Sequence, residues 1–322
     1  MKNTLTLSVI KKRFSAYSLY MLLFVLMVAV SFANKNFLSV QNIKNIFQQI
    51  SINGILAVGM TFVIITGGID LSVGSLLGFS GVIAASLVSG GGNPFYAVLA
   101  GIIAGLLFGV INGLLVAYAK IVPFIVTLGM LSIARGVTNV YTHGSPIIKL
   151  DKRFTAIGQS AFLGIGFPVW IFIGMLIVGF IILHTTKLGR YTLAVGGNEE
   201  AARLSGVNIT KVKLLVYSLS ALMASLAGIL LASRLGSGQP NAGDGYELDA
   251  ITAAIVGGTS LSGGVGTIGG TLAGAIIIGI INTGMNTLGI SPYYQLVIKG
   301  SVILAAVIID RNIAEKGNRR EG

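Results

Sequence analysis

The sequence predicts an all-α polytopic membrane protein with about ten transmembrane helices, some of them interrupted by glycine. Of its 322 residues, 54% are hydrophobic and only 10% are charged, whereas a soluble domain has about 25% charged residues. The mean hydropathy is +0.88. The apolar residues are gathered in runs that polar segments separate, and about 20 such residues cross the hydrocarbon core of a bilayer. A soluble globular fold is therefore excluded.

Ten apolar runs divide the chain into predicted spans. The first follows a short basic segment and could instead be a cleaved signal peptide, but its length and the spans after it favour a transmembrane helix. In the fourth, small residues recur every four positions, which predicts close helix packing and a central place in the bundle. The predicted spans are residues 14–33, 46–66, 76–88, 95–119, 124–141, 167–184, 214–235, 250–261, 271–288 and 293–309.

The longest charged interruption is the segment 187–213, whose middle has the features of a short helix. Asn198 is a good N-cap, Glu199 and Glu200 would occupy the first turn, where the helix dipole favours carboxylates, and Gly206 can end the helix in the left-handed conformation. An ordinary connector is the alternative, but loops this long are usually functional or disordered. We therefore expect a partner-binding helix made of Asn198, Glu199, Glu200, Ala201, Ala202, Arg203, Leu204, Ser205 and Gly206.

Lysine and arginine residues predict the orientation. Ten spans place both termini on one side of the membrane, and that side holds fourteen basic residues against five, with Arg135, Arg234 and Lys299 set aside because they fall in or near spans. The richer side is the cytoplasm. The prediction is a cytoplasmic N-terminal segment 1–13, a transmembrane domain 14–309 with the cytoplasmic loop 187–213, an outward-facing acidic loop 236–249, and a cytoplasmic tail 310–322.

A glycine-rich pattern, Gly-Gly-x-x-Leu-Ser-x-Gly, occurs at residues 67–74 and again at 257–264. Glycine-interrupted spans in both halves of a transporter indicate discontinuous helices that line the pathway; tight hairpins between ordinary spans are the alternative. Asp70 favours the first interpretation, because it is the only acidic residue among the first 150 and a carboxylate near a span is costly.

Polar residues within the spans add further pathway candidates. A carboxamide both donates and accepts hydrogen bonds, as a polyhydroxylated solute requires, although hydrogen bonds between helices explain any single one equally well. The candidates are Asp70, Ser72, Asn53, Asn112, Asn282 and Asn286.

Several classes of function are excluded by what the sequence lacks. There is no cysteine and there are only two histidines, so we expect no disulfide and no metal site. No phosphate-binding loop occurs, so that any ATP must be used by another subunit. The net charge of +12 is dispersed between apolar spans, which predicts contacts with anionic lipid headgroups and not with nucleic acid.

Three stretches, in this order, resemble the permease subunits of bacterial ABC sugar importers, which include ribose, xylose, arabinose and galactoside permeases. They are NGILAVGMTFVIITGGIDLSVGS, TKLGRYTLAVGGNEEAARLSGVNITKVK and GYELDAITAAIVGGTSLSGGVGTIGGTLAGA. The similarity covers residues 36–310 and is greatest to the ribose permeases. It implies a ten-span, type II-like permease in the bacterial inner membrane that performs no covalent chemistry.

The same resemblance implies partners. They are a separate cytoplasmic ATPase, which would hold ATP and Mg, a periplasmic sugar-binding protein, and a second permease copy that makes a homodimer. The segment 198–206 would then be the coupling helix that contacts the ATPase. Two other functions stay open: a self-sufficient secondary carrier or channel, which needs no ATPase, and a structural membrane scaffold, which would tolerate loss of Asp70 and of the loop.

Overall fold

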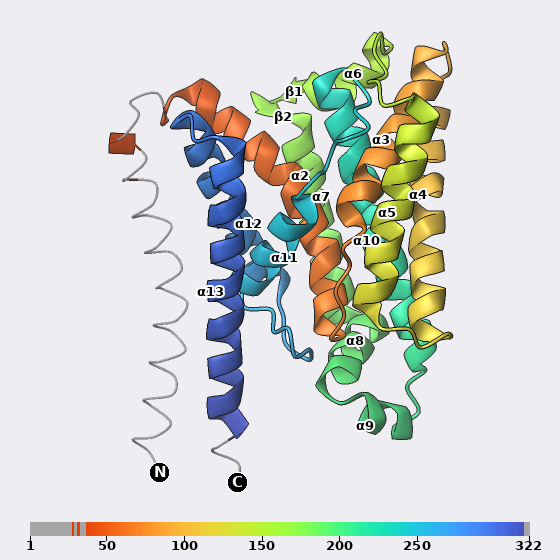
Figure 1. Cartoon of the computed structure of the whole chain (residues 1–322), viewed down its shortest axis with the longest axis vertical. Helices are drawn as coiled ribbons and strands as arrows, with labels where there is room; N and C mark the ends of the chain where they lie inside the picture. The colour runs from red at the N-terminus through yellow and green to blue at the C-terminus, as the bar shows by residue number, and fades with distance from the viewer. Residues whose placement is uncertain (1–27, 29–30, 33–36, 319–322) are drawn as a thin grey trace.

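The computed structural model describes residues 28, 31–32 and 37–318, which form a bundle of helices with one small hairpin (Figure 1). The predicted segment 1–13 and nearly all of the predicted span 14–33 lie outside the described residues. The elements are α2 (Val40–Ile65), α3 (Val73–Ser89), α4 (Pro94–Ala117), α5 (Pro123–Thr142), α6 (Lys152–Gln159), β1 (Ala161–Phe162), β2 (Ile165–Gly166), α7 (Phe167–Thr185), α8 (Lys187–Gly197), α9 (Glu199–Leu204), α10 (Ile209–Leu235), α11 (Tyr246–Val256), α12 (Ile268–Thr287) and α13 (Pro292–Asn318).

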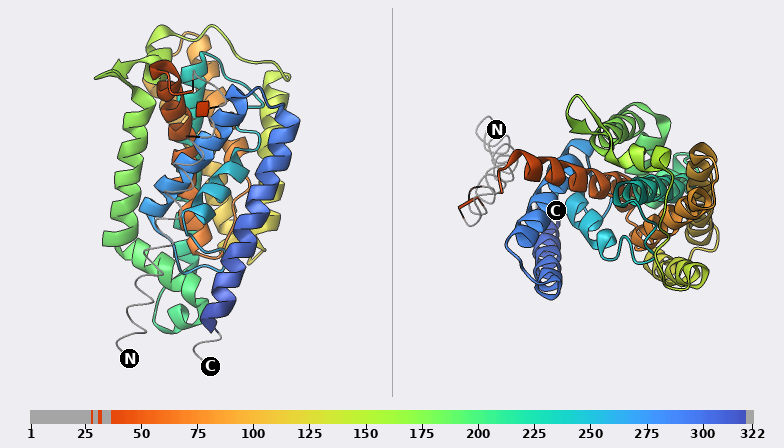
Figure 2. Two further views of the ribbon diagram at one scale, coloured as in Figure 1. Left: turned by 90° about the vertical axis from the view of Figure 1, so that its left-hand side faces the viewer. Right: turned by 90° about the horizontal axis from the view of Figure 1, so that it is seen from above.

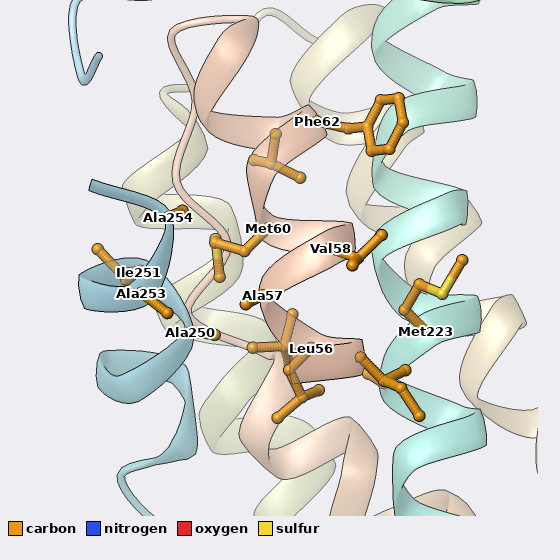
Figure 3. Packing of buried hydrophobic residues seen from close by; sticks show 14 of the residues in the cluster. Leu56, Ala57, Val58, Met60, Phe62, Met223, Ala250, Ile251, Ala253 and Ala254 are labelled. Atoms are coloured by element: carbon orange, nitrogen blue, oxygen red, sulfur yellow. The ribbon is translucent and has the colours of Figure 1, made fainter. Parts of the chain in front are cut away.

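Helix α2 is the centre of the bundle. It is buried continuously from Ile50 to Ile65, because α7, α10, α11 and α12 surround it. Figure 3 shows its side chains Leu56, Ala57 and Met60 between those of α11 on one side and Met223 of α10 on the other. A helix that is apolar all round must be buried on all sides, and α2 satisfies this requirement inside the protein.

Helix α4, by contrast, lies at the edge, so its predicted central place is wrong. The small residues do form its packing face: Gly101, Gly105, Gly109 and Gly113 are buried, while Phe95, Leu99, Ile103 and Leu107 on other faces are exposed. The glycine face packs against α10 and, through Ser80, against α3. The four-residue repeat therefore indicates close helix contacts, and it does not place the helix at the centre of the bundle.

The number of about ten spans is not confirmed. Within the described residues, six helices are long and apolar enough to cross a membrane, namely α2, α4, α5, α7, α10 and α12, and α3 is a shorter apolar helix. At about 1.5 Å per residue, α3 and α11 are too short to cross the roughly 30 Å hydrocarbon core. The chain before each of them, residues 66–72 and 236–245, is not helical. The first of these breaks overlaps the glycine-rich segment 67–74. The second precedes α11, whereas the glycine-rich segment 257–264 connects α11 to α12.

The two ends of the bundle differ. Helix α6 and the hairpin β1–β2 lie at one end, and α8 and α9 lie at the other, on the far side of the long helices (Figures 1 and 2). In the hairpin, Ala161 pairs with Gly166 and Phe162 with Ile165 in antiparallel register. The segment 187–213 therefore stands apart from α6 and the hairpin by the full length of the bundle.

We expect Gly228→Ala to destabilise the bundle, because the added Cβ would collide with the carbonyl oxygen of Leu77 where α10 crosses α3. Overpacking of this kind costs about 1–3 kcal/mol. The thermal midpoint of the detergent-purified protein measures it. Gly129→Ala is the matched control, since Gly129 of α5 has no described atom within 4 Å of the added Cβ; an equal loss in both variants would mean that helix packing is not the cause.

Candidate functional site

Helix α9 is the predicted short helix, and the local features of the sequence form it. The Asn198 side chain accepts a hydrogen bond from the Ala201 amide at 2.9 Å, and Glu199 and Glu200 occupy the first turn. Gly206 has φ +83° and so ends the helix in the left-handed region. Arg203 forms an ion pair with Glu200, and its hydrogen bonds hold the pKa of Glu200 below the ordinary value.

The surface of α9 is exposed except at one residue. Leu204 keeps 78% of its surface, whereas Ala202 keeps 5% and belongs to the main hydrophobic core. Ala202 is thus part of the protein's own packing and is not available to a partner. Leu204 lies beside Glu200 and Arg203, so α9 presents an apolar side chain and charged groups together on one exposed surface.

Most of the segment 187–213 is helical, because α8 precedes α9 and α10 begins at Ile209. Glu199 reaches Lys213 of α10 with 2.7 Å between Oε2 and Nζ, which fixes α9 against the long helix. Beside α9 there is a cavity of ≈ 750 Å³. Its lining comes from α9, from the start of α10 and from residues 116–123 between α4 and α5.

The two glycine-rich segments meet at α8. The Gly264 amide donates a hydrogen bond to the Ile65 carbonyl at 2.8 Å, which joins the end of α2 to the second segment. A Cβ on Gly196 of α8 would collide with that same carbonyl, and a Cβ on Gly263 would approach the Gly67 amide nitrogen. Helix α8 therefore lies directly on both segments and connects α9 to the bundle.

Asp70, Ser72 and Asn112 are brought together, and all three are buried. Asp70 Oδ1 accepts hydrogen bonds from the Ser72 amide at 3.0 Å and from the Ser72 hydroxyl at 2.6 Å. Its Oδ2 accepts one from Ser220 of α10 at 3.0 Å, while Asn112 donates to the Ser72 hydroxyl at 2.9 Å. The carboxylate thus holds the start of α3 against α4 and α10.

We expect Asp70→Asn to lower uptake about tenfold, because the amide cannot replace the charge-assisted bonds, which are worth roughly 1.5 kcal/mol more than neutral ones. Uptake per permease in membrane vesicles measures this. Ser220→Ala is the control, as it removes one donor and keeps the carboxylate. If uptake by the Asn variant equals that of the parent, Asp70 is a local turn residue and not a pathway residue.

Asn53 and Asn282 belong to a second polar cluster, around Asp249 of α11. Asp249 Oδ2 accepts hydrogen bonds from Asn53 at 3.3 Å and from Asn282 at 2.9 Å. Lys299 of α13 donates to the same oxygen at 3.0 Å and lies 2.9 Å from Oδ1. The remaining candidate, Asn286, lies apart and accepts a hydrogen bond from Gln295 at 2.9 Å, close to the turn between α12 and α13.

This cluster shows that the predicted acidic loop 236–249 is wrong in part. Asp244 is exposed, but Glu247 and Asp249 are buried and lie within α11. The segment before α11 enters the bundle, and Arg135 of α5 holds it there by donating to the carbonyls of Pro240 at 2.7 Å and Ala242 at 2.9 Å. Non-helical backbone inside a membrane protein needs donors of this kind.

Asp249, Lys299 and Arg135 are polar residues inside the bundle that the sequence interpretation did not name as pathway candidates. An ionisable residue inside an apolar span is a functional candidate by default, and Lys299 and Arg135 meet that criterion. The described residues hold no group of three or more His, Asp or Glu side chains that could bind a metal ion. What the site offers is polar contacts between helices and one exposed helix.

Comparison with known proteins identifies relatives over nearly the whole chain. A family model described as branched-chain amino acid transport system / permease component matches residues 42–307. The ribose import permease protein RbsC of Bacillus subtilis (strain 168) is 50% identical over 291 residues, 90% of each chain. That of Escherichia coli (strain K12) is 51% identical over 292 residues, 89% of this chain and 91% of its own.

A more distant relative is named for a different sugar. The L-arabinose transport system permease protein AraH of Escherichia coli (strain K12) is 40% identical over 295 residues, which cover 92% of this chain and 90% of that protein. No solved structure matches the chain.

Proposed function

This chain belongs to the family of permease components of ABC importers, and we propose that it is the membrane subunit that moves ribose into the cytoplasm. The observation that supports ribose is the identity of 50% and 51% to ribose permeases against 40% to an arabinose permease, each over about nine-tenths of the chain. The chain is a non-catalytic transport subunit.

The exposed helix supports a separate ATPase as the source of energy. The sequence has no phosphate-binding loop of its own, and α9 presents Leu204 beside Glu200 and Arg203 at one end of the bundle. We propose that α9 is the coupling helix, that its end of the bundle faces the cytoplasm of a bacterial inner membrane together with both termini, and that ATP and Mg bind to the ATPase.

The remaining parts of the proposal concern the other partners. A periplasmic binding protein delivers the sugar to the opposite end, and a second copy of the permease completes the transport unit. A cavity of ≈ 750 Å³ lies beside α9, and one of only ≈ 10 Å³ lies between α11, α12 and α13. Neither is a sugar passage between the long helices, and we place the pathway between two permease copies.

Uptake of labelled sugars by cells that lack and then regain this gene tests the proposal. We expect ribose uptake to disappear on deletion and to return on complementation, while arabinose and xylose uptake stay unchanged. Ribose uptake that persists, or that returns in cells whose partner ATPase has been deleted, would contradict an ATP-driven ribose permease and favour a self-sufficient carrier or channel.

A further inference from the structure

The buried ion pair between α11 and α13 has no place in the function proposed so far. Asp249 keeps 3% of its side-chain surface and Lys299 keeps 20%, so the carboxylate is inside the bundle and the ammonium is at its edge. Breaking such a pair leaves a buried charge without a partner, which is strongly unfavourable. A charged pair at this depth therefore needs a specific reason.

Helix α13 is attached to the described bundle by few contacts. Among the described helices it packs mainly against α11, with Val302 beside the ion pair in a small cavity shared with Thr252. Most of its large apolar side chains are exposed, namely Tyr293, Tyr294, Leu296, Val297, Leu304 and Ile308. Within the described part of the chain, Val302 and Val307 are the residues of α13 that pack against the main core, so its polar contacts supply much of its attachment there.

If the Lys299 ammonium moves away from Asp249, the carboxylate keeps two other hydrogen-bond donors. Asn53 and Asn282 would still donate to Asp249 Oδ2. Their own Oδ1 atoms are buried and have no hydrogen-bond partner among the described residues, so they can accept from an ammonium that has moved. Both states of α13 would then keep hydrogen bonds to the carboxylate and to the ammonium, as a switchable element requires.

Resting on the proposed function, we propose that Lys299 and Asp249 are positioning residues of the transport step, forming a clasp between α13 and α11 that opens and closes in each cycle. Helix α13 is the moving element, and α2, α11 and α12 provide the fixed side through Asn53, Asp249 and Asn282. Neither residue is proposed to bind the sugar.

Charge variants in proteoliposomes that contain the permease, its ATPase and the binding protein test the need for the pair. We expect Lys299→Gln to lower ribose uptake at least tenfold while the ATPase still co-purifies, and Lys299→Arg to recover most of the uptake, because a guanidinium can pair with Asp249. A merely structural role would lower uptake and assembly together. Uptake by Lys299→Gln at the parent rate would overturn the proposal.

A reversible cross-link tests the opening. The natural chain has no cysteine, so in Thr252→Cys/Val302→Cys only the engineered pair reacts with a membrane-permeant bifunctional thiosulfonate. We expect uptake to fall at least tenfold on cross-linking and to recover with reductant, while each single-cysteine variant transports normally. Undiminished uptake by the cross-linked protein, or failure of the pair to cross-link, would overturn the proposal. Uncross-linked protein that takes up no ribose would instead contradict the proposed function.

Discussion

Leu204→Glu is expected to abolish ATP-dependent uptake by removing the ATPase from the complex. Leu204 keeps 78% of its surface free and lies on α9 beside Glu200 and Arg203, so the substitution leaves the fold untouched and places a carboxylate in the proposed contact. Burying it there costs about 2 kcal/mol or more, which weakens binding about 30-fold. Co-purification of the ATPase with tagged permease measures the loss.

Leu163→Glu is the matched control for that variant. Leu163 is equally exposed at 78%, but it lies in the hairpin connection at the opposite end of the bundle (Figure 1). The control should keep the ATPase bound. Equal recovery of the ATPase with both variants would show that α9 is not the docking helix. Substitution of Ala202 would be ambiguous, because Ala202 is buried in the core.

Gly196→Val is expected to separate ATPase binding from transport. The new side chain would collide with the Ile65 carbonyl oxygen and would push α8 off the two glycine-rich segments, whereas α9 and its exposed surface stay intact. We expect the ATPase to co-purify and to hydrolyse ATP, with ribose uptake lowered at least tenfold, since α8 no longer transmits its movement to α2 and α12.

The adjacent glycine provides the control for this second variant. Gly197→Val adds the same side chain one residue further along α8, where no described atom lies within 4 Å of the Cβ. Uptake by this control should stay close to that of the parent. If both variants transport at the parent rate, α8 is not the connection between the ATPase and the bundle, and the force must pass through another contact.

Local features of the fold could be predicted from the sequence, because the residues that form them are neighbours in the chain. Helix α9 is the clearest case: its cap at Asn198, the carboxylates of its first turn and the left-handed Gly206 all lie within nine residues. The glycine-rich segment 67–74 likewise marks the break between α2 and α3. The burial of Ala202 could not be predicted, because it depends on how the core packs around α9.

Features that depend on distant residues could not be predicted. Asp249 was assigned to an outward loop because polar residues precede it, yet its partners Asn53 and Lys299 are far away in the sequence. The small residues of α4 predicted a close contact correctly, but no local pattern shows that α2 is the central helix. The six pathway candidates belong to separate places in the bundle: three lie around Asp70, two lie around Asp249, and Asn286 pairs with Gln295.

The most direct test of the account is ribose uptake by proteoliposomes that contain purified permease, with and without its ATPase. We predict ATP-dependent uptake with the ATPase and binding protein present, none when the ATPase is omitted, and none when Leu204→Glu permease replaces the parent. Ribose uptake by the permease alone, or ATP-dependent uptake that survives Leu204→Glu, would contradict coupling of an ATPase to this permease through α9.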